Sequence, residues 1–112
     1  MAESIFSKII ARQIPAKIVF EDDHYIVIED IQPAAPVHLL VIPKKPIATL
    51  NDLTPEDAEL VGGMFLLAGG VMRKLGHTDF RTVINCGLGA GQSVFHLHLH
   101  VLAGRTFTWP PG

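Results

Sequence analysis

Cysteine is almost absent from this chain of 112 residues, since Cys86 is the only one. A lone cysteine cannot form an internal disulfide bond, which excludes a disulfide-stabilised secreted domain and favours a reducing compartment. The N-terminal segment also lacks the long apolar region of a signal peptide. The apolar run at 60–72 ends at Arg73 and is shorter than the ~20 residues that a membrane-spanning helix needs. We therefore expect a cytoplasmic protein with no membrane partner.

Acidic residues are missing from the last third of the chain. All eleven acids lie within residues 1–79, whereas residues 80–112 carry Arg81, Arg105 and three histidines. The net charge of −2 lacks the basic excess of a general nucleic-acid-binding protein. The composition thus argues against nucleic acid as a partner, and the acid-free segment favours a small anionic ligand.

Hydrophobic periodicity and turn residues predict one α+β domain over residues 1–112, a length below the ~150 residues typical of a single domain. A short helix is expected at 4–12. A long helix is expected at 55–75, with Thr54 as N-cap and Gly76 as terminator. Strands with short connections, which suit antiparallel pairing, are expected at residues 16–20, 24–29, 36–42, 81–86 and 94–102.

Two glycine pairs interrupt the long predicted helix, Gly62-Gly63 and Gly69-Gly70. Each glycine costs up to ~1 kcal/mol in a helix interior, so we expect another element to pack closely against them. That element is either the protein's own sheet or a helix of a second copy.

The segment FHLHLHV holds three of the six histidines in the chain, at positions 96, 98 and 100. On a strand, alternate residues project from one face, so the spacing predicts an imidazole array on one side and Leu97 and Leu99 in the core. Three identical titratable groups on one face indicate a functional site. Metal binding and phosphoryl chemistry are the two candidates.

Metal binding is the less favoured candidate. Alternate residues on a strand stand ~6.6 Å apart, so His96 and His100 cannot both reach one ion, although two neighbouring histidines with His38 could. No acid in residues 80–112 is available to orient a ligating imidazole. We therefore expect no metal and no cofactor, and keep a small metal-binding protein as an alternative.

The glycine-rich loop before the histidines favours phosphoryl chemistry. Gly87, Gly89 and Gly91 can adopt positive φ and expose consecutive backbone N–H groups to an anion. Gln92 and Ser93 add an amide and a hydroxyl next to the first histidine.

HLHLHVL at 96–102, preceded by GQS, resembles the motif of the histidine triad (HIT) family. The similarity extends to IFSKIIARQIPAKIVFEDD, PAAPVHLLVIPKK and WPPG, which look like the Hint branch, the purine nucleoside phosphoramidate hydrolases. The resemblance implies a five-stranded antiparallel sheet with one short N-terminal helix and one long helix. It also implies a homodimer with a continuous ten-stranded sheet, in which the tail 108–111 lies near the partner's site.

The resemblance implies roles for individual residues. His98 is the nucleophile that becomes nucleotidylated, and Asp30 holds the ribose hydroxyls. The other substrate-binding positions are Ile31, His38, Asn85, Gly91, Gln92, Ser93 and His100, with Phe6, Ile9 and Ile28 beside Ile31 in the base pocket. Two positions depart from the usual pattern of the branch. Pro46 stands where histidine is common, and Glu29 stands where the family varies, next to the base-side contacts.

The chemistry expected at this site is cleavage of a P–N bond. A neutral imidazole can attack phosphorus and leave again in a second step. We expect His98 to attack the α-phosphorus of an adenosine or guanosine 5'-phosphoramidate, releasing an amine and then AMP or GMP, without a metal. A neutral nucleophile beside one cationic histidine is expected. The alternative is a regulatory protein that binds purine nucleotides without turnover.

Overall fold

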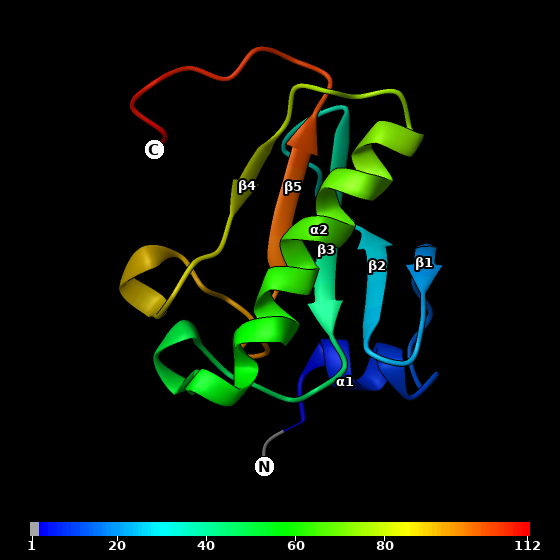
Figure 1. Cartoon of the computed structure of the whole chain (residues 1–112), viewed down its shortest axis with the longest axis vertical. Helices are drawn as coiled ribbons and strands as arrows, with labels where there is room; N and C mark the ends of the chain where they lie inside the picture. The colour runs from blue at the N-terminus through cyan, green and yellow to red at the C-terminus, as the bar shows by residue number, and fades with distance from the viewer. Residues whose placement is uncertain (1–2) are drawn as a thin grey trace.

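The computed structural model describes residues 3–112, which form a five-stranded antiparallel sheet in the order β1-β2-β3-β5-β4 (Figure 1). The strands are β1 (Ile18–Glu21), β2 (Tyr25–Glu29), β3 (Val37–Pro43), β4 (Arg81–Val83) and β5 (Leu99–Ala103). The helices are α1 (Ile5–Ile10) and α2 (Ala58–Lys74). This arrangement confirms the predicted fold class of one sheet with a short and a long helix.

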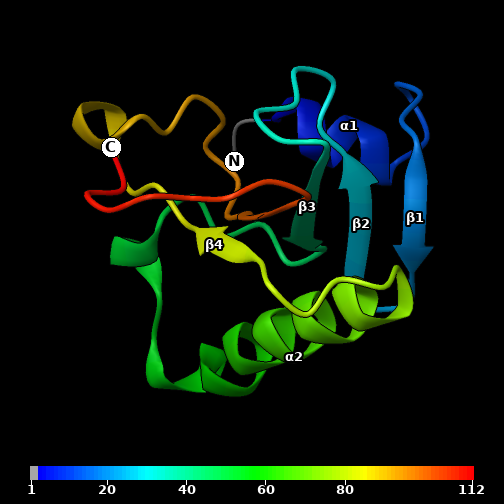
Figure 2. The same cartoon turned by 90° about the horizontal axis from the view of Figure 1, so that it is seen from above.

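The two helices cover opposite faces of the sheet, α1 on one side and α2 on the other (Figure 2). Side chains alternate accordingly along the strands. Val27, Leu39 and Val101 belong to the core beneath α2, whereas Ile28 and Leu40 belong to the core beneath α1. Even-numbered residues of β3 and β5 therefore face α1, and this register places His38 and His100 on that side.

Helix α2 begins later than predicted, because residues Pro55–Asp57 form a 3-10 turn before Ala58. Thr54 and Asp57 still close the N-terminus, since the Thr54 N–H donates to the Asp57 carboxylate at 2.9 Å. Within residues 3–112, no helix is long and apolar enough to cross a membrane.

The glycines of α2 lie in two different surroundings, even within one pair. A Cβ on Gly63 would lie 2.1 Å from the Tyr25 hydroxyl, which donates to the Leu60 carbonyl at 2.7 Å. Gly63 thus permits close packing against the sheet. A Cβ on Gly62 or Gly70 would meet open space, with no neighbouring element within 4 Å, so these two glycines lie on the outer side of the helix. Packing against the protein's own sheet therefore accounts for Gly63 but not for Gly62 and Gly70, for which pairing with a helix of a second copy stays a prediction.

Strand β5 is shorter than predicted, since residues 94–98 precede it without strand structure. The Leu97 N–H donates to the Ile47 carbonyl at 2.6 Å, and the Val94 carbonyl accepts from the Gln92 side chain at 3.0 Å. These backbone groups form hydrogen bonds with loop residues instead of with a neighbouring strand. Pairing with β3 therefore begins only at Leu99. His96 and His98 therefore lie outside the sheet ladder.

Candidate active site

A cleft of about 560 Å³ lies between α1 and the adjacent face of the sheet. The structure brings six of the predicted site residues to its walls: Asp30, Ile31, His38, Ser93, His98 and His100. Phe6, Ile9 and Ile28 add the expected apolar surface. A cleft of this size, mostly apolar with a few polar groups at one end, is typical of a small-molecule site.

The His98 ring is held with one nitrogen fixed and the other free. Its Nδ1 lies 2.7 Å from the His96 carbonyl oxygen, which can only accept, so Nδ1 carries the proton. The neutral ring then has its lone pair on Nε2. The Phe6 ring packs edge-on against the imidazole, with centroids 4.8 Å apart. Backbone and packing therefore fix both the tautomer and the orientation of a candidate nucleophile.

A chain of hydrogen bonds fixes the tautomers of His38 and His100 as well. The Ala34 N–H donates to His38 Nδ1 at 3.0 Å, so Nδ1 is the acceptor and the ring proton of His38 is on Nε2. His38 Nε2 lies 2.9 Å from His100 Nδ1, which must then accept. The proton of the neutral His100 is consequently on Nε2. His100 thus offers a donor, and its ring centroid is 5.0 Å from that of His98.

Asp30 supplies the carboxylate that the cleft presents beside these histidines. One oxygen accepts from the Gln32 N–H at 2.8 Å, and the other lies 3.4 Å from His38 Nε2. The Asp30 N–H in turn donates to the His38 carbonyl at 3.0 Å. The loop 30–36 therefore holds the carboxylate and the His38 ring as one unit.

His96 does not line the cleft with the other two histidines of the motif. Its Nε2 lies 2.7 Å from the Pro43 carbonyl oxygen, and the residue is 3% exposed. The prediction of three imidazoles on one face fails here because residues 94–98 do not follow strand geometry. His96 instead ties this segment to the end of β3, and its own carbonyl orients His98.

The pKa values of the motif histidines are all lowered. Burial is the main cause for His96, His98 and His100, and it brings the pKa of His100 to about 4 with help from the neighbouring rings of His98 and His38. These rings are neutral at pH 7. The expected neutral nucleophile is supported, but the expected cation beside it is absent from His100, because a buried ring with imidazole neighbours loses its proton more readily.

The glycine-rich loop adopts the predicted backbone at two positions, since φ is +90° at Gly87 and +92° at Gly91. Gln92 has a different role from the predicted phosphate contact. Its side chain is 2% exposed, accepts from the Gly87 N–H at 2.8 Å and donates to the Ala48 carbonyl at 2.8 Å. The amide braces the loop and is not free for a ligand. Asn85 and Gly91 lie next to one another in the same region but do not line the cleft.

Asp30, His38 and His100 are close enough to be considered as metal ligands, with ligand atoms within 4.8 Å of one another. The hydrogen bonds of His38 do not suit this role. Coordination through Nε2 would place the ring proton on Nδ1, where the Ala34 N–H already points at 3.0 Å. Two donors would then face each other. The donor set fits a hydrogen-bond chain better than a metal.

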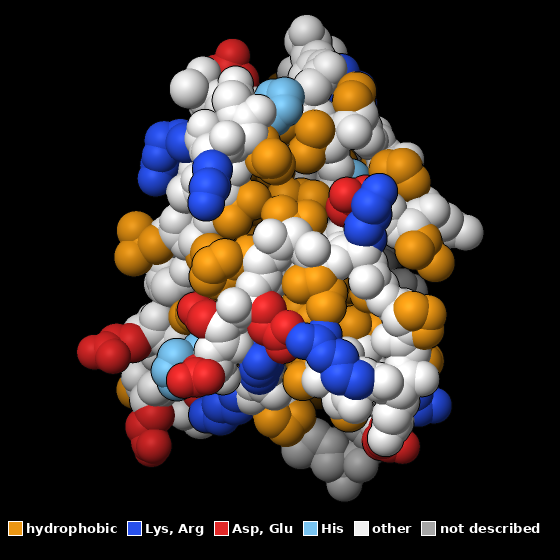
Figure 3. Space-filling view, turned by 90° about the vertical axis from the view of Figure 1, so that its right-hand side faces the viewer, with side chains coloured by type: hydrophobic (Ala, Val, Ile, Leu, Met, Phe, Trp, Pro, Cys, Tyr) orange, Lys and Arg blue, Asp and Glu red, His pale blue; other side chains and the backbone are white. Residues whose placement is uncertain are grey.

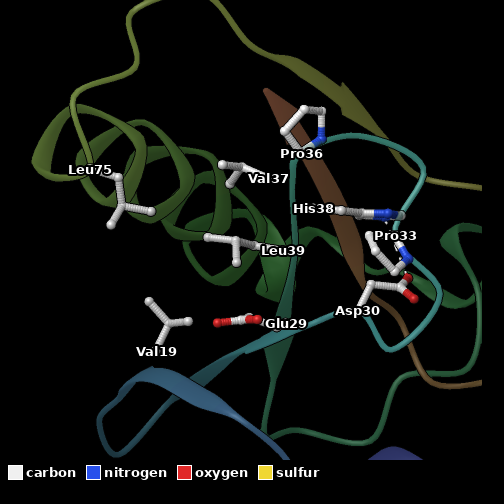
Figure 4. A pocket seen from close by; sticks show the side chains of 9 residues that line it. All are labelled: Val19, Glu29, Asp30, Pro33, Pro36, Val37, His38, Leu39 and Leu75. Carbon is white, nitrogen blue, oxygen red and sulfur yellow. Dashed lines mark ion pairs between the residues drawn. The ribbon is translucent and has the colours of Figure 1, made fainter. Parts of the chain in front are cut away.

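The Glu29 carboxylate points away from the cleft, although Glu29 and both of its neighbours border it. Figure 4 shows this carboxylate near Val19 and Leu39, in a neighbouring hollow of about 290 Å³ that shares Asp30 and His38 with the cleft. The Lys17 ammonium lies 4.0 Å from it. The alternation of β2 explains the direction, since Glu29 follows Ile28 of the α1 side. The carboxylate therefore points to the α2 side of the sheet rather than toward the apolar base-side wall.

Part of the cleft wall was not predicted from the sequence. Ile14, Pro15 and Ala16, which connect α1 to β1, line it together with Leu40 of β3 and Val94. No periodicity marks Ile14 and Pro15 as a wall, and Ala16, predicted as the first residue of a strand, lies before β1 in the structure.

Comparison with known proteins agrees with this geometry. The family described as "Scavenger mRNA decapping enzyme C-term binding" matches residues 3–107. An uncharacterized HIT-like protein of Synechocystis is 58% identical over the full length of both chains. The crystal structure of a HIT family hydrolase from Legionella pneumophila has a TM-score of 0.95 at 46% identity, covering 98% of this chain and all of that one. A HIT family hydrolase from Clostridium thermocellum has a TM-score of 0.92 at 41% identity, covering 96% of each chain.

A five-stranded antiparallel sheet that carries hydrogen-bonded histidines beside a glycine-rich loop defines the histidine triad class of proteins. The chain belongs to the histidine triad (HIT) family, and its structural neighbours include proteins named as HIT hydrolases.

Proposed function

We propose that the protein is a metal-independent hydrolase of purine nucleoside 5'-phosphoramidates, and that His98 forms a covalent nucleotidyl intermediate. The observation that carries this proposal is the tautomer of His98, whose Nδ1 is bound to the His96 carbonyl while Nε2 keeps its lone pair. A neutral, oriented imidazole at the wall of a nucleotide-sized cleft is suited to attack on phosphorus.

In the first step, His98 Nε2 forms a bond to the α-phosphorus as the P–N bond breaks, and the departing amine takes a proton from the Ser93 hydroxyl, which regains one from solvent. The Ser93 hydroxyl borders the cleft near the histidines and is the group we assign to assist the leaving nitrogen. In the second step, water attacks the phosphorus, the bond from phosphorus to His98 Nε2 breaks, a proton of the water passes to solvent, and AMP or GMP is released.

His100 supports this chemistry as a neutral donor. Because His100 Nδ1 accepts from His38, its Nε2–H is available to a phosphate oxygen. Hydrogen bonds from N–H donors then stabilise the negative charge of the phosphate, rather than a positively charged side chain. Asp30 would accept from the ribose hydroxyls, and the apolar wall of Phe6, Ile9 and Ile28 would hold the purine.

The experiment that tests the proposal follows the protein's intact mass after mixing with adenosine 5'-phosphoramidate. Wild type should gain the mass of one adenylyl group transiently and release AMP with EDTA present. His98→Asn should lose turnover by about 10⁴-fold or more, with nucleotide affinity kept within about tenfold. His24→Asn, at an exposed turn outside the cleft, is the matched control and should behave as wild type.

Two results would contradict the proposal. Nucleotide binding without an adduct and without AMP release would instead support a regulatory nucleotide-binding protein. Loss of activity with EDTA and its recovery with Zn²⁺ would support a metal site.

A further inference from the structure

The chain turns sharply after β5, and this turn brings the C-terminal segment against loop 30–36. Gly104 has φ of +98°, and a Cβ on it would lie 2.8 Å from Pro36 Cβ. Only glycine combines this backbone conformation with such a close approach. Arg105 is thereby placed next to the loop that carries Asp30 and precedes His38.

The Arg105 side chain is held at several points. Its Nε donates to the Ala34 carbonyl at 3.2 Å, and its Nη1 donates to the Thr106 carbonyl at 3.1 Å. Its guanidinium carbon lies 4.2 Å from the centroid of the Phe107 ring, a cation–π distance. Although Arg105 is exposed, these contacts link the C-terminal segment to Ala34.

Ala34 is the residue whose N–H donates to His38 Nδ1 at 3.0 Å. That bond sets the His38 tautomer, and His38 Nε2 in turn sets the tautomer of His100 at 2.9 Å. We propose that Arg105 is a positioning residue, which holds Ala34 so that its N–H keeps His38 in the Nε2–H form and keeps the His100 donor aligned in the cleft.

The competing explanation is that Arg105 only packs the C-terminal segment. Arg81 provides a matched control for it. The Arg81 guanidinium carbon lies 5.2 Å from the same Phe107 centroid, and its Nη2 donates to the Thr108 carbonyl at 2.9 Å. Arg81 therefore holds the same segment, while its side-chain hydrogen bond goes to Thr108 rather than to loop 30–36. Loss of packing alone would affect both arginine variants equally.

The direct test is the tautomer of His38, measured by two-bond ¹H–¹⁵N correlation NMR of the ring nitrogens in the full chain. Wild type should show His38 in the Nε2–H form at pH 7. Arg105→Met should show a mixture with the Nδ1–H form, and Arg105→Lys, which keeps a donor, should lie closer to wild type. Arg81→Met should match wild type. This measurement needs no substrate, so it decides on the positioning role even if the proposed phosphoramidase activity fails.

The kinetic test rests on the proposed function. With adenosine 5'-phosphoramidate, Arg105→Met should lower kcat about tenfold and change KM less than twofold, because the His100 donor is misaligned more than the binding cleft is. Arg105→Lys should recover part of kcat, and it also serves as the test variant should Arg105→Met fold poorly. Equal effects of Arg105→Met and Arg81→Met, or an unchanged His38 tautomer in both Arg105 variants, would overturn the proposal.

Discussion

Protonation of His98 controls whether the candidate nucleophile has a lone pair. Burial lowers the pKa of His98 from its ordinary value of 6.5, so the neutral form persists into mildly acidic solution. We expect the acid limb of kcat/KM, which reports the free protein, to have its midpoint below pH 6.5, where His98 becomes protonated. A pH–rate profile with adenosine 5'-phosphoramidate between pH 4.5 and 8 measures the midpoint.

A variant of Phe6 tests the cause of this shift. The ring is 6% exposed and lies 4.8 Å from the His98 imidazole, so Phe6→Ala admits water to it. Better solvation raises the pKa of His98, and the midpoint of the acid limb in kcat/KM should move up toward 6.5. An unchanged midpoint would show that burial by Phe6 does not lower the pKa.

At the scale of single residues, the sequence predicted some roles well and missed others. The alternation of histidine and leucine correctly placed His98 and His100 at the cleft and Leu97 and Leu99 in the core. It could not predict His96, whose position depends on a hydrogen bond to Pro43, 53 residues away. Nor could it show that the Gln92 amide is used within the loop, because a polar side chain near a phosphate motif looks the same whether it contacts a ligand or the backbone.

At the scale of elements, α2 packs against the sheet through Gly63. We expect Gly63→Ala to lower the free energy of unfolding by about 2 to 4 kcal/mol, because the added methyl displaces the Tyr25 hydroxyl from the Leu60 carbonyl. Urea denaturation followed by circular dichroism measures the change.

A second substitution, Tyr25→Phe, tests whether the Tyr25 hydroxyl is what makes Gly63→Ala destabilising. Removing the hydroxyl in Tyr25→Phe leaves the ring carbon 3.0 Å from the new Cβ instead of the oxygen at 2.1 Å. The cost of Gly63→Ala should therefore be clearly smaller in the Tyr25→Phe background. Equal costs in both backgrounds would mean that the Tyr25 hydroxyl is not the obstacle.

Elements were more predictable than their ends. The capping residues Thr54 and Gly76 marked α2, yet its first turn is 3-10 and the strand at 94–102 begins only at Leu99. Both differences arise where backbone groups bind partners outside the local pattern, such as the Ile47 carbonyl. Local patterns report the preference of a segment, whereas such partners decide where regular pairing begins.

At the scale of the whole molecule, the outer face of α2 is an exposed apolar surface. Leu66 is 79% exposed and Phe65 46% exposed, beside the open positions of Gly62 and Gly70. The β1 edge of the sheet is apolar too. Figure 3 shows hydrophobic side chains on this side of the molecule, and Val19 of β1 is 38% exposed. We propose that the α2 face pairs with a second copy of the chain, because glycines allow two helices to approach closely.

Light scattering should then give about twice the 12.2 kDa of one chain. Leu66→Arg places a charge in the proposed interface and should yield monomers at micromolar concentration. Val19→Arg, on the β1 edge, is the control and should leave the dimer intact. A wild-type monomer, or dissociation by Val19→Arg alone, would contradict pairing through α2.

The neutral histidines of the cleft make binding and proton uptake a single linked event. An anion beside His98 and His100 favours their protonated forms, so the complex should hold more protons than the free protein and ligand together. For adenosine 5'-sulfate, whose own charge stays constant, affinity should rise as the pH falls from about 7 to 5.5. Calorimetry in two buffers of different ionisation enthalpy counts the protons taken up, and equal heats in both buffers would exclude this linkage. Protonation of His98 also removes its lone pair, so the acidic solution that tightens anion binding lowers the fraction of the complex that can react.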